Sequence, residues 1–161
     1  MIIKQQLEDI AQRMQQRRWL LVTAESCTGG GLAQQVTSLP GSSAWFDRGF
    51  VTYSNAAKQE LLDVPEALID EYGAVSEEIV VAMVRGALAH SRAQLAVAIT
   101  GIAGPDGGSK AKPVGTVWFA WATETKTRST RNLFEGDRQA IRSQSEQYAL
   151  QGLLDLLNSL D

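Results

Sequence analysis

The chain has 161 residues, of which 44% are hydrophobic and 20% are charged, a composition typical of one soluble globular domain with a hydrophobic core. A net charge of −3 argues against a nucleic-acid-binding surface, which normally needs a basic face. One cysteine, Cys27, and one histidine, His90, are too few for an internal disulfide or a structural zinc site. We therefore expect a single domain over 1–161.

The sequence also shows none of the segments that direct a protein into or across a membrane. No apolar run approaches the roughly 20 residues of a membrane span. The segment 1–6 has no long apolar stretch and no small-residue cleavage site of the kind found in signal peptides. Together with the cysteine content, this pattern predicts a cytoplasmic protein that does not bind a membrane.

Hydrophobic spacing and capping residues predict helices that alternate with strands along most of the chain. In chain order, the predicted elements are helix 2–17, strand 19–23, helix 32–38, strand 46–53, helices 55–62, 65–73 and 76–90, strands 95–100, 114–123 and 128–134, and helix 137–160. This order predicts an α/β fold, a layered α/β/α single domain with a mixed, mainly parallel sheet, followed by a C-terminal hairpin and a long helix.

Two glycine-rich turns follow predicted strands. The segment 23–31 reads Thr-Ala-Glu-Ser-Cys-Thr-Gly-Gly-Gly and precedes a helix, so its backbone N–H groups suit a phosphate or carboxylate. It matches neither the P-loop nor the dinucleotide-binding pattern, and a simple tight turn is the alternative. The segment 100–105 also ends a strand, and since the carboxyl ends of strands line ligand crevices, we expect one shared pocket.

A lysine is the best candidate for a catalytic base, because the only histidine lies at what reads as a solvated helix end. Lys58 falls in the first turn of a predicted helix, where the helix dipole and partial burial would lower its pKa; an ordinary exposed lysine is the alternative. The candidate nucleophiles are Cys27, near a helix N-terminus, and Ser42 and Ser43, which follow a Pro-Gly turn. We expect the strand over 46–53 to bring Lys58 back towards these serines.

Two arginines on the last predicted helix suit an anionic ligand. Arg138 and Arg142 lie one helical turn apart, so both can clamp a phosphate or a carboxylate. A solvated helix face is the alternative interpretation.

Six short segments of the sequence, taken together and in their order along the chain, form a recognisable set. They are Ala-Glu-Ser-Cys-Thr-Gly-Gly at 24–30, Pro-Gly-Ser-Ser at 40–43, Tyr-Ser-Asn-Ala-Ala-Lys at 53–58, Gly-Ala-Val-Ser-Glu at 73–77, Thr-Gly-Ile-Ala-Gly-Pro at 100–105 and Lys-Pro-Val-Gly-Thr-Val at 112–117. This set resembles the CinA C-terminal domain family and covers nearly the whole chain. The resemblance implies hydrolysis of nicotinamide mononucleotide to nicotinate mononucleotide and ammonia, a pyridine-nucleotide salvage step.

The resemblance also implies a mechanism, that of a serine amidase in which a lysine and a tyrosine assist the serine. Carried over by position, the nucleophile is Ser43, the base is Lys58 and the assisting residue is Tyr53. The implied substrate-binding residues lie in the two glycine-rich turns and on the last helix: Glu25, Ser26, Thr28, Gly29, Gly30, Thr100, Gly101 and Arg138, with Arg142 as the alternative arginine.

The expected partners follow from the same resemblance. The ligand is a small nucleotide substrate, no metal or organic cofactor is required, and we expect no nucleic acid, no membrane and a homo-oligomeric protein. A nucleotide-binding or regulatory module with little amidase activity is the alternative function.

Overall fold

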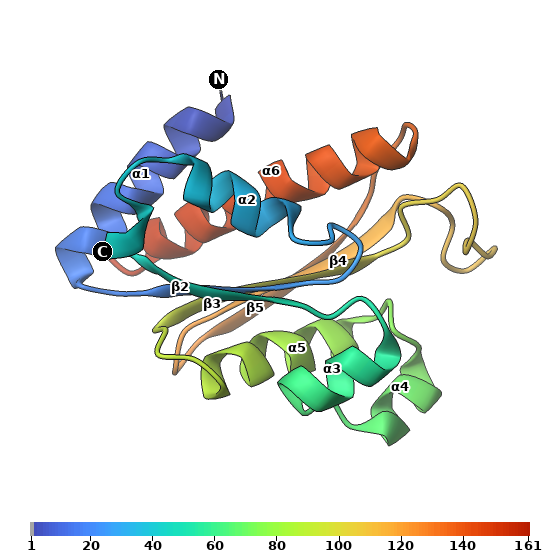
Figure 1. Cartoon of the computed structure of the whole chain (residues 1–161). Coiled ribbons are helices and arrows are strands. Elements are labelled where there is room, and N and C mark those ends of the chain that lie inside the picture. Colours follow the sequence, from blue (N-terminus) through green and yellow to red (C-terminus); the bar gives the residue numbers. More distant parts are fainter. Residues whose placement is uncertain (1) are drawn as a thin grey trace.

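A five-stranded sheet with helices on both faces forms the centre of the structure, a computed structural model that describes residues 2–161 (Figure 1). The strands are β1 (Leu21–Glu25), β2 (Phe46–Val51), β3 (Leu95–Gly101), β4 (Thr116–Ala122) and β5 (Thr127–Leu133), in the order β2-β1-β3-β4-β5. β1 is parallel to β2 and β3, whereas β4 is antiparallel to β3 and β5. The expected mixed sheet and the C-terminal hairpin are therefore confirmed.

Helices cover the sheet in two layers (Figure 1). One layer holds α1 (Ile2–Arg17), α2 (Gly31–Ser38) and α6 (Arg138–Ser159), and the other holds α3 (Asn55–Leu62), α4 (Glu66–Tyr72) and α5 (Glu77–Ala89). Among the described residues, no helix has the length and hydrophobicity to cross a membrane. The layered α/β/α fold predicted from the sequence is thus confirmed.

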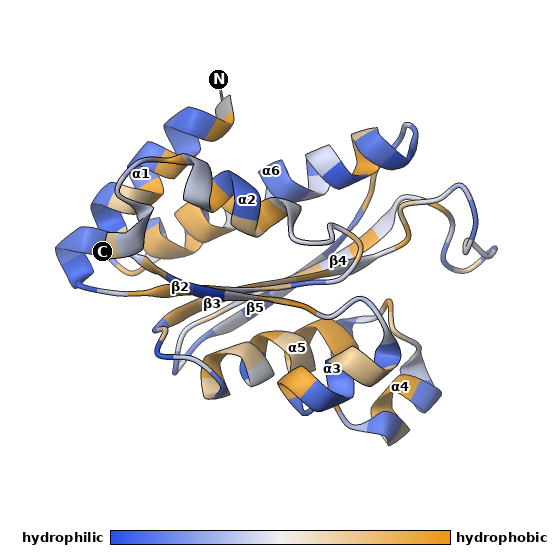
Figure 2. Ribbon diagram, in the orientation of Figure 1, coloured by the Kyte–Doolittle hydropathy of each residue, from blue (hydrophilic) through white to orange (hydrophobic). Residues whose placement is uncertain are grey.

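Two hydrophobic cores fill the space between the sheet and its helical layers. Because side chains alternate along a strand, Val97 and Ile99 of β3 enter the core under α1 and α6, whereas Ala96 and Ala98 enter the core under α5. Figure 2 shows the same division, with the apolar faces of the helices turned towards the sheet. β3 is buried on both faces, which its continuous apolar sequence explains.

Short polar side chains begin three of the helices. Ser54 caps α3 by accepting the N–H of Ala57, and Ser76 caps α5 in the same way. Asp137 caps α6 by accepting the N–H of Ala140. The helices predicted over 55–62, 76–90 and 137–160 therefore begin within one residue of their predicted starts.

β1 begins and ends two residues later than the sequence predicted. It runs from Leu21 to Glu25, so Ser26 comes directly after the strand. β1, β2 and β3 are parallel, so Glu25, Val51 and Gly101 end at the same edge of the sheet, which we call the carboxyl edge. The turns that follow these three strands are consequently neighbours in space.

Candidate active site

The carboxyl edge brings a buried lysine into contact with a serine. The side-chain Nζ of Lys58 lies 3.0 Å from Ser26 Oγ, 2.9 Å from the carbonyl oxygen of Thr52 and 3.2 Å from that of Tyr53. Lys58 is only 1% exposed, and Ser26 is 7% exposed. The first turn of α3 places Lys58 here, because its cap fixes the helix start just beyond the end of β2.

Burial changes the acidity of the Lys58 amine. Removal from water lowers its pKa from 10.5 to about 8, and a weak opposing effect comes from Cys27. In the neutral amine, the two N–H groups can donate to the carbonyl oxygens of Thr52 and Tyr53 while the nitrogen lone pair faces the Ser26 hydroxyl. This arrangement suits a general base for Ser26.

Ser43 lies at the other end of β2, so the expected approach of Ser43 to Lys58 does not occur. Ser43 belongs to the short 3₁₀ turn Ser42–Ala44, which precedes the strand, whereas Lys58 follows it. A strand of six residues spans about 20 Å, and it carries the chain away from Ser43 instead of folding back. The structure therefore pairs Lys58 with Ser26 and leaves Ser43 exposed at the opposite edge.

Cys27, the other candidate nucleophile, is buried beside Ser26 and does not have the character of a reactive thiol. Its side chain is 5% exposed, and burial raises the pKa of the thiol to about 12. A thiol with such a pKa stays protonated at neutral pH, and the thiolate is the nucleophilic form.

Glu25 anchors the first glycine-rich turn from within the protein. Its carboxylate is 1% exposed and accepts hydrogen bonds from Thr28 Oγ1 at 2.6 Å and from the N–H groups of Leu32 and Ala33 at 2.8 and 3.0 Å. A negative group therefore already occupies the first amides of α2, where the sequence predicted a phosphate. Gly29 and Gly30 complete the turn in left-handed conformations, with φ of 60° and 100°.

The second glycine-rich turn lies beside the first, because β1 and β3 are parallel neighbours in the sheet. Thr100, which is 1% exposed, donates its hydroxyl to the carbonyl oxygen of Ala74 and so ties β3 to the segment before α5. Gly101 ends β3, and the carbonyl of Gly104 turns towards the start of α6.

Both arginines of α6 reach the carboxyl edge. Arg138 donates to the carbonyl oxygen of Gly104 at 2.8 Å and to the Tyr53 hydroxyl at 3.3 Å. Arg142 donates to the carbonyl oxygen of Thr28 at 3.1 Å. Among residues 2–161, no carboxylate lies within ion-pair distance of either arginine, so neither guanidinium group is already paired with an anion.

The remaining chemically interesting groups lie away from this edge. His90 follows α5 and lies 2.5 Å from an Asp63 carboxylate oxygen, on the surface, as its expected place at a solvated helix end implied. Within the described part of the chain, no three His, Cys, Asp or Glu residues are grouped as they would be around a metal ion.

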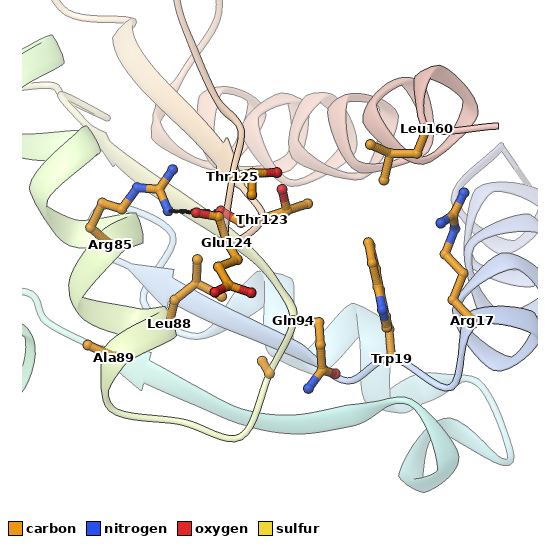
Figure 3. Close-up of a pocket in the computed structure, with 11 residues that line it drawn as sticks. Arg17, Trp19, Arg85, Leu88, Ala89, Gln94, Thr123, Glu124, Thr125 and Leu160 are labelled. Atoms are coloured by element: carbon orange, nitrogen blue, oxygen red, sulfur yellow. Dashed lines mark hydrogen bonds between the residues drawn. The ribbon is translucent and has the colours of Figure 1, made fainter.

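A cavity of about 680 Å³ opens at the opposite edge of the sheet, between Trp19, Leu88, Glu124 and Leu160 (Figure 3). One of its two arginines, Arg85, donates to the carbonyl oxygens of the β4–β5 turn. The cavity holds no serine or lysine, so we place the candidate active site at the carboxyl edge.

Comparison with known proteins identifies the family of the chain. Residues 3–157 match the CinA C-terminal domain. The chain belongs to the CinA C-terminal domain family. This finding confirms the resemblance carried by the six sequence segments.

Relatives of this CinA-family chain include named enzymes. The chain is 60% identical over 136 residues to the nicotinamide-nucleotide amidohydrolase PncC of Pseudomonas putida, covering 84% of this chain and 85% of that protein. It is 55% identical over 147 residues to PncC of Escherichia coli K12, covering 91% and 89%. A CinA-like protein of Geotalea uraniireducens is 50% identical over 94% of this chain, which spans 36% of that longer protein.

Solved structures share the fold. A CinA superfamily protein from Klebsiella pneumoniae matches with a TM-score of 0.93 at 38% identity, over 98% of both chains. The competence/damage-inducible protein CihA from Agrobacterium tumefaciens matches with a TM-score of 0.94 at 41% identity, over 98% of this chain and 96% of that one.

Sequence reasoning identified Lys58 but not its partner. It placed Ser26 among the substrate-binding residues, and only the contact with Lys58 singles it out as a candidate nucleophile. One signal was present in the sequence, because a serine between a buried strand and a glycine-rich helix start is where several hydrolases carry their nucleophile.

Proposed function

We propose that this protein is a nicotinamide-nucleotide amidohydrolase, which converts nicotinamide mononucleotide to nicotinate mononucleotide and ammonia. The observation that carries the proposal is the 3.0 Å contact between Ser26 Oγ and the buried Lys58 Nζ at the carboxyl edge. The names of the relatives from Pseudomonas putida and Escherichia coli support the substrate.

In the proposed mechanism, Ser26 is the nucleophile and Lys58 is its general base. Ser26 Oγ attacks the carboxamide carbon while its proton passes to Lys58 Nζ. The C–N bond then breaks, and the Lys58 ammonium returns the proton to the departing ammonia, leaving an ester on Ser26. Water attacks this ester with Lys58 again taking the proton, and Ser26 regains its hydrogen as nicotinate mononucleotide leaves.

The turn after Ser26 supplies the donors for the developing oxyanion. Within residues 2–161, the backbone N–H groups of Cys27 and Thr28 donate to no other residue, and they directly follow the nucleophile in the chain. In related strand–nucleophile–helix turns, the N–H after the nucleophile stabilises the tetrahedral oxygen.

The arginines of α6 are the proposed site for the nucleotide phosphate. The amides of α2 are less suitable, because the Glu25 carboxylate already accepts two of them and would repel a second anion. Arg138 and the exposed ring of Tyr53 contact one another at the mouth of the site. Arg138 can bind the phosphate while Tyr53 stacks on the pyridine ring.

The proposed setting is pyridine-nucleotide salvage in the cytoplasm, by a homo-oligomer that needs no metal and binds no nucleic acid. The net charge of −3 supports the last point. Because the base and the nucleophile are both protein side chains, the mechanism has no step that requires a cofactor.

Purified protein incubated with nicotinamide mononucleotide tests the proposal. We expect equal amounts of ammonia and nicotinate mononucleotide, and we expect Lys58→Met to abolish both. Combining Ser26→Ala with Lys58→Met should add no further loss, because the two residues act as a unit. A nucleotide-binding or regulatory module would instead bind the nucleotide, with the same affinity in both variants, and release no ammonia.

A further inference from the structure

Glu25 is a buried carboxylate whose side-chain hydrogen bonds all go to the glycine-rich turn after β1 and to the start of α2. Its two side-chain oxygens accept three hydrogen bonds, from the hydroxyl of Thr28 and from the N–H groups of Leu32 and Ala33. No cation forms an ion pair with it among residues 2–161, so these donors and the positive end of α2 compensate its charge. The segment held between Glu25 and α2 is the turn 26–30, which begins with Ser26.

The backbone of Glu25 holds the other half of the proposed catalytic pair. Its carbonyl oxygen accepts the N–H of Thr52 at 2.8 Å, and the carbonyl oxygen of Thr52 accepts Lys58 Nζ at 2.9 Å. Lys58 Nζ in turn contacts Ser26 Oγ. Hydrogen bonds and one peptide bond therefore form a closed ring through Glu25, Thr52, Lys58 and Ser26.

Backbone hydrogen bonds and the Arg142 guanidinium also hold this turn. Within residues 2–161, however, only the Glu25 carboxylate ties the Thr28 hydroxyl to the first amides of α2. Gly30 precedes α2 in a left-handed conformation and offers no side-chain cap, and Gly29 beside it is also left-handed. A helix start normally takes its cap from the residue at its N-terminus, whereas here the capping carboxylate comes from the end of the neighbouring strand.

We propose that Glu25 is a positioning residue for the amidase reaction, whose carboxylate fixes the turn 26–30 so that Ser26 Oγ stays against Lys58 Nζ. This inference rests on the proposed function of Ser26 and Lys58. It replaces the expectation that Glu25 binds substrate, because a carboxylate that is 1% exposed and accepts three hydrogen bonds has no free face for a ligand.

Glu25→Gln tests the proposal with almost no change in side-chain size. The amide can accept with one oxygen only, and its NH₂ group faces an N–H donor of α2, so one end of the turn is released. Because a misplacement of about 1 Å can cost about 100-fold in rate, we expect kcat to fall by about ten- to 100-fold. KM for nicotinamide mononucleotide should change by less than about threefold.

Substrate binding separates positioning from direct contact. We expect calorimetry to give the same dissociation constant for nicotinamide mononucleotide in Ser26→Ala and in Ser26→Ala/Glu25→Gln. A second readout needs no substrate, since a fluorophosphonate that labels activated serines should react more slowly with Ser26 in Glu25→Gln than in the unaltered protein.

Two neighbouring residues provide controls. Thr28→Val removes one of the three donors and keeps the branched shape, so it should lower kcat less than Glu25→Gln does. Glu146 is a half-buried carboxylate of α6 beside Gly31, and within residues 2–161 it accepts a hydrogen bond from Gln35 alone. Glu146→Gln should leave kcat within about twofold.

Three results would overturn the proposal: an unchanged kcat in folded Glu25→Gln, a weaker nucleotide affinity that accounts for the whole loss, or a loss of equal size in Glu146→Gln. If Glu25→Gln does not fold, an unchanged kcat in Thr28→Val overturns it. Failure of the proposed function is distinguishable, because the unaltered protein would then release no ammonia.

Discussion

The amine of Lys58 is buried away from water without a counter-charge, and this burial decides its acidity. It is 1% exposed, and no carboxylate pairs with it within residues 2–161. Burial therefore lowers its pKa to about 8, so a useful fraction of the amine is neutral near physiological pH. The neighbouring Cys27 thiol stays protonated over the same range, because burial raises its pKa to about 12.

The pH dependence of the reaction should report on Lys58. Only the neutral amine accepts the Ser26 proton, so kcat/KM should rise with pH and level off above the Lys58 pKa of about 8. At two pH units below that value, the rate should be about 100-fold lower than the plateau. Initial rates of ammonia release between pH 6 and pH 9 measure this, and a flat profile would contradict the role of Lys58 as the base.

Sequence reasoning singled out Lys58 but not its contact with Ser26, for a physical reason. Lys58 could be identified because the signals around it are local, a cap and a first helical turn. Ser26 lies 32 residues away in the chain, and it meets Lys58 only because β1 and β2 pair in parallel, with Glu25 opposite Val51. Spacing along one strand instead suggested Ser43, which the same strand carries to the far edge.

Strands and helices divide the site between them. β1 and β2 end at the carboxyl edge and supply the serine and the carbonyl oxygens, and α3 supplies the lysine. α6 begins at the same edge, where its first two turns present Arg138 and Arg142. The caps that start α3 and α6 were predictable, whereas the return of α6 to the end of β1 depends on the packing of the whole helix.

The position of Arg138 on α6 leads us to expect a preference for substrates that carry a phosphate. Nicotinamide riboside, which lacks this group, should have a kcat/KM at least about tenfold below that of the mononucleotide. Arg138→Met should remove most of this difference by raising KM for the mononucleotide alone. Arg131→Met, which changes an exposed arginine of β5, is the matched control and should change neither value. Equal kcat/KM values for both substrates in the unaltered protein would refute a phosphate-binding role.

At the scale of the whole molecule, the charges are unevenly placed. The net charge is −3, yet the groups that converge on the carboxyl edge are Lys58, Arg138 and Arg142, with Glu25 buried among amides. Such a local excess of positive charge would attract the proposed nucleotide substrate to one edge of an otherwise acidic protein. The layered fold and its two cores were predictable from hydrophobic patterning, but this convergence required the sheet order.

The buried lysine should also affect global stability. The folded state loses the Lys58 proton near pH 8, whereas an unfolded chain keeps it up to about pH 10.5, so the unfolded state binds more protons between these values. The free energy of unfolding should therefore rise with pH in this window, by at most about 3 kcal/mol from this group. Urea denaturation of the unaltered protein and Lys58→Met at pH 8 and pH 10 isolates the effect, and an identical pH response of the two proteins would contradict it.

The turnover of two serine variants tests the pairing of Ser26 with Lys58 most directly. The measurement is kcat for ammonia release from nicotinamide mononucleotide by folded Ser26→Ala and Ser43→Ala. We expect Ser26→Ala to lose at least about 1,000-fold and Ser43→Ala to stay within about twofold of the unaltered protein. If Ser43→Ala were inactive and Ser26→Ala active, the reaction would take place at the opposite end of β2, and the site described here would be wrong.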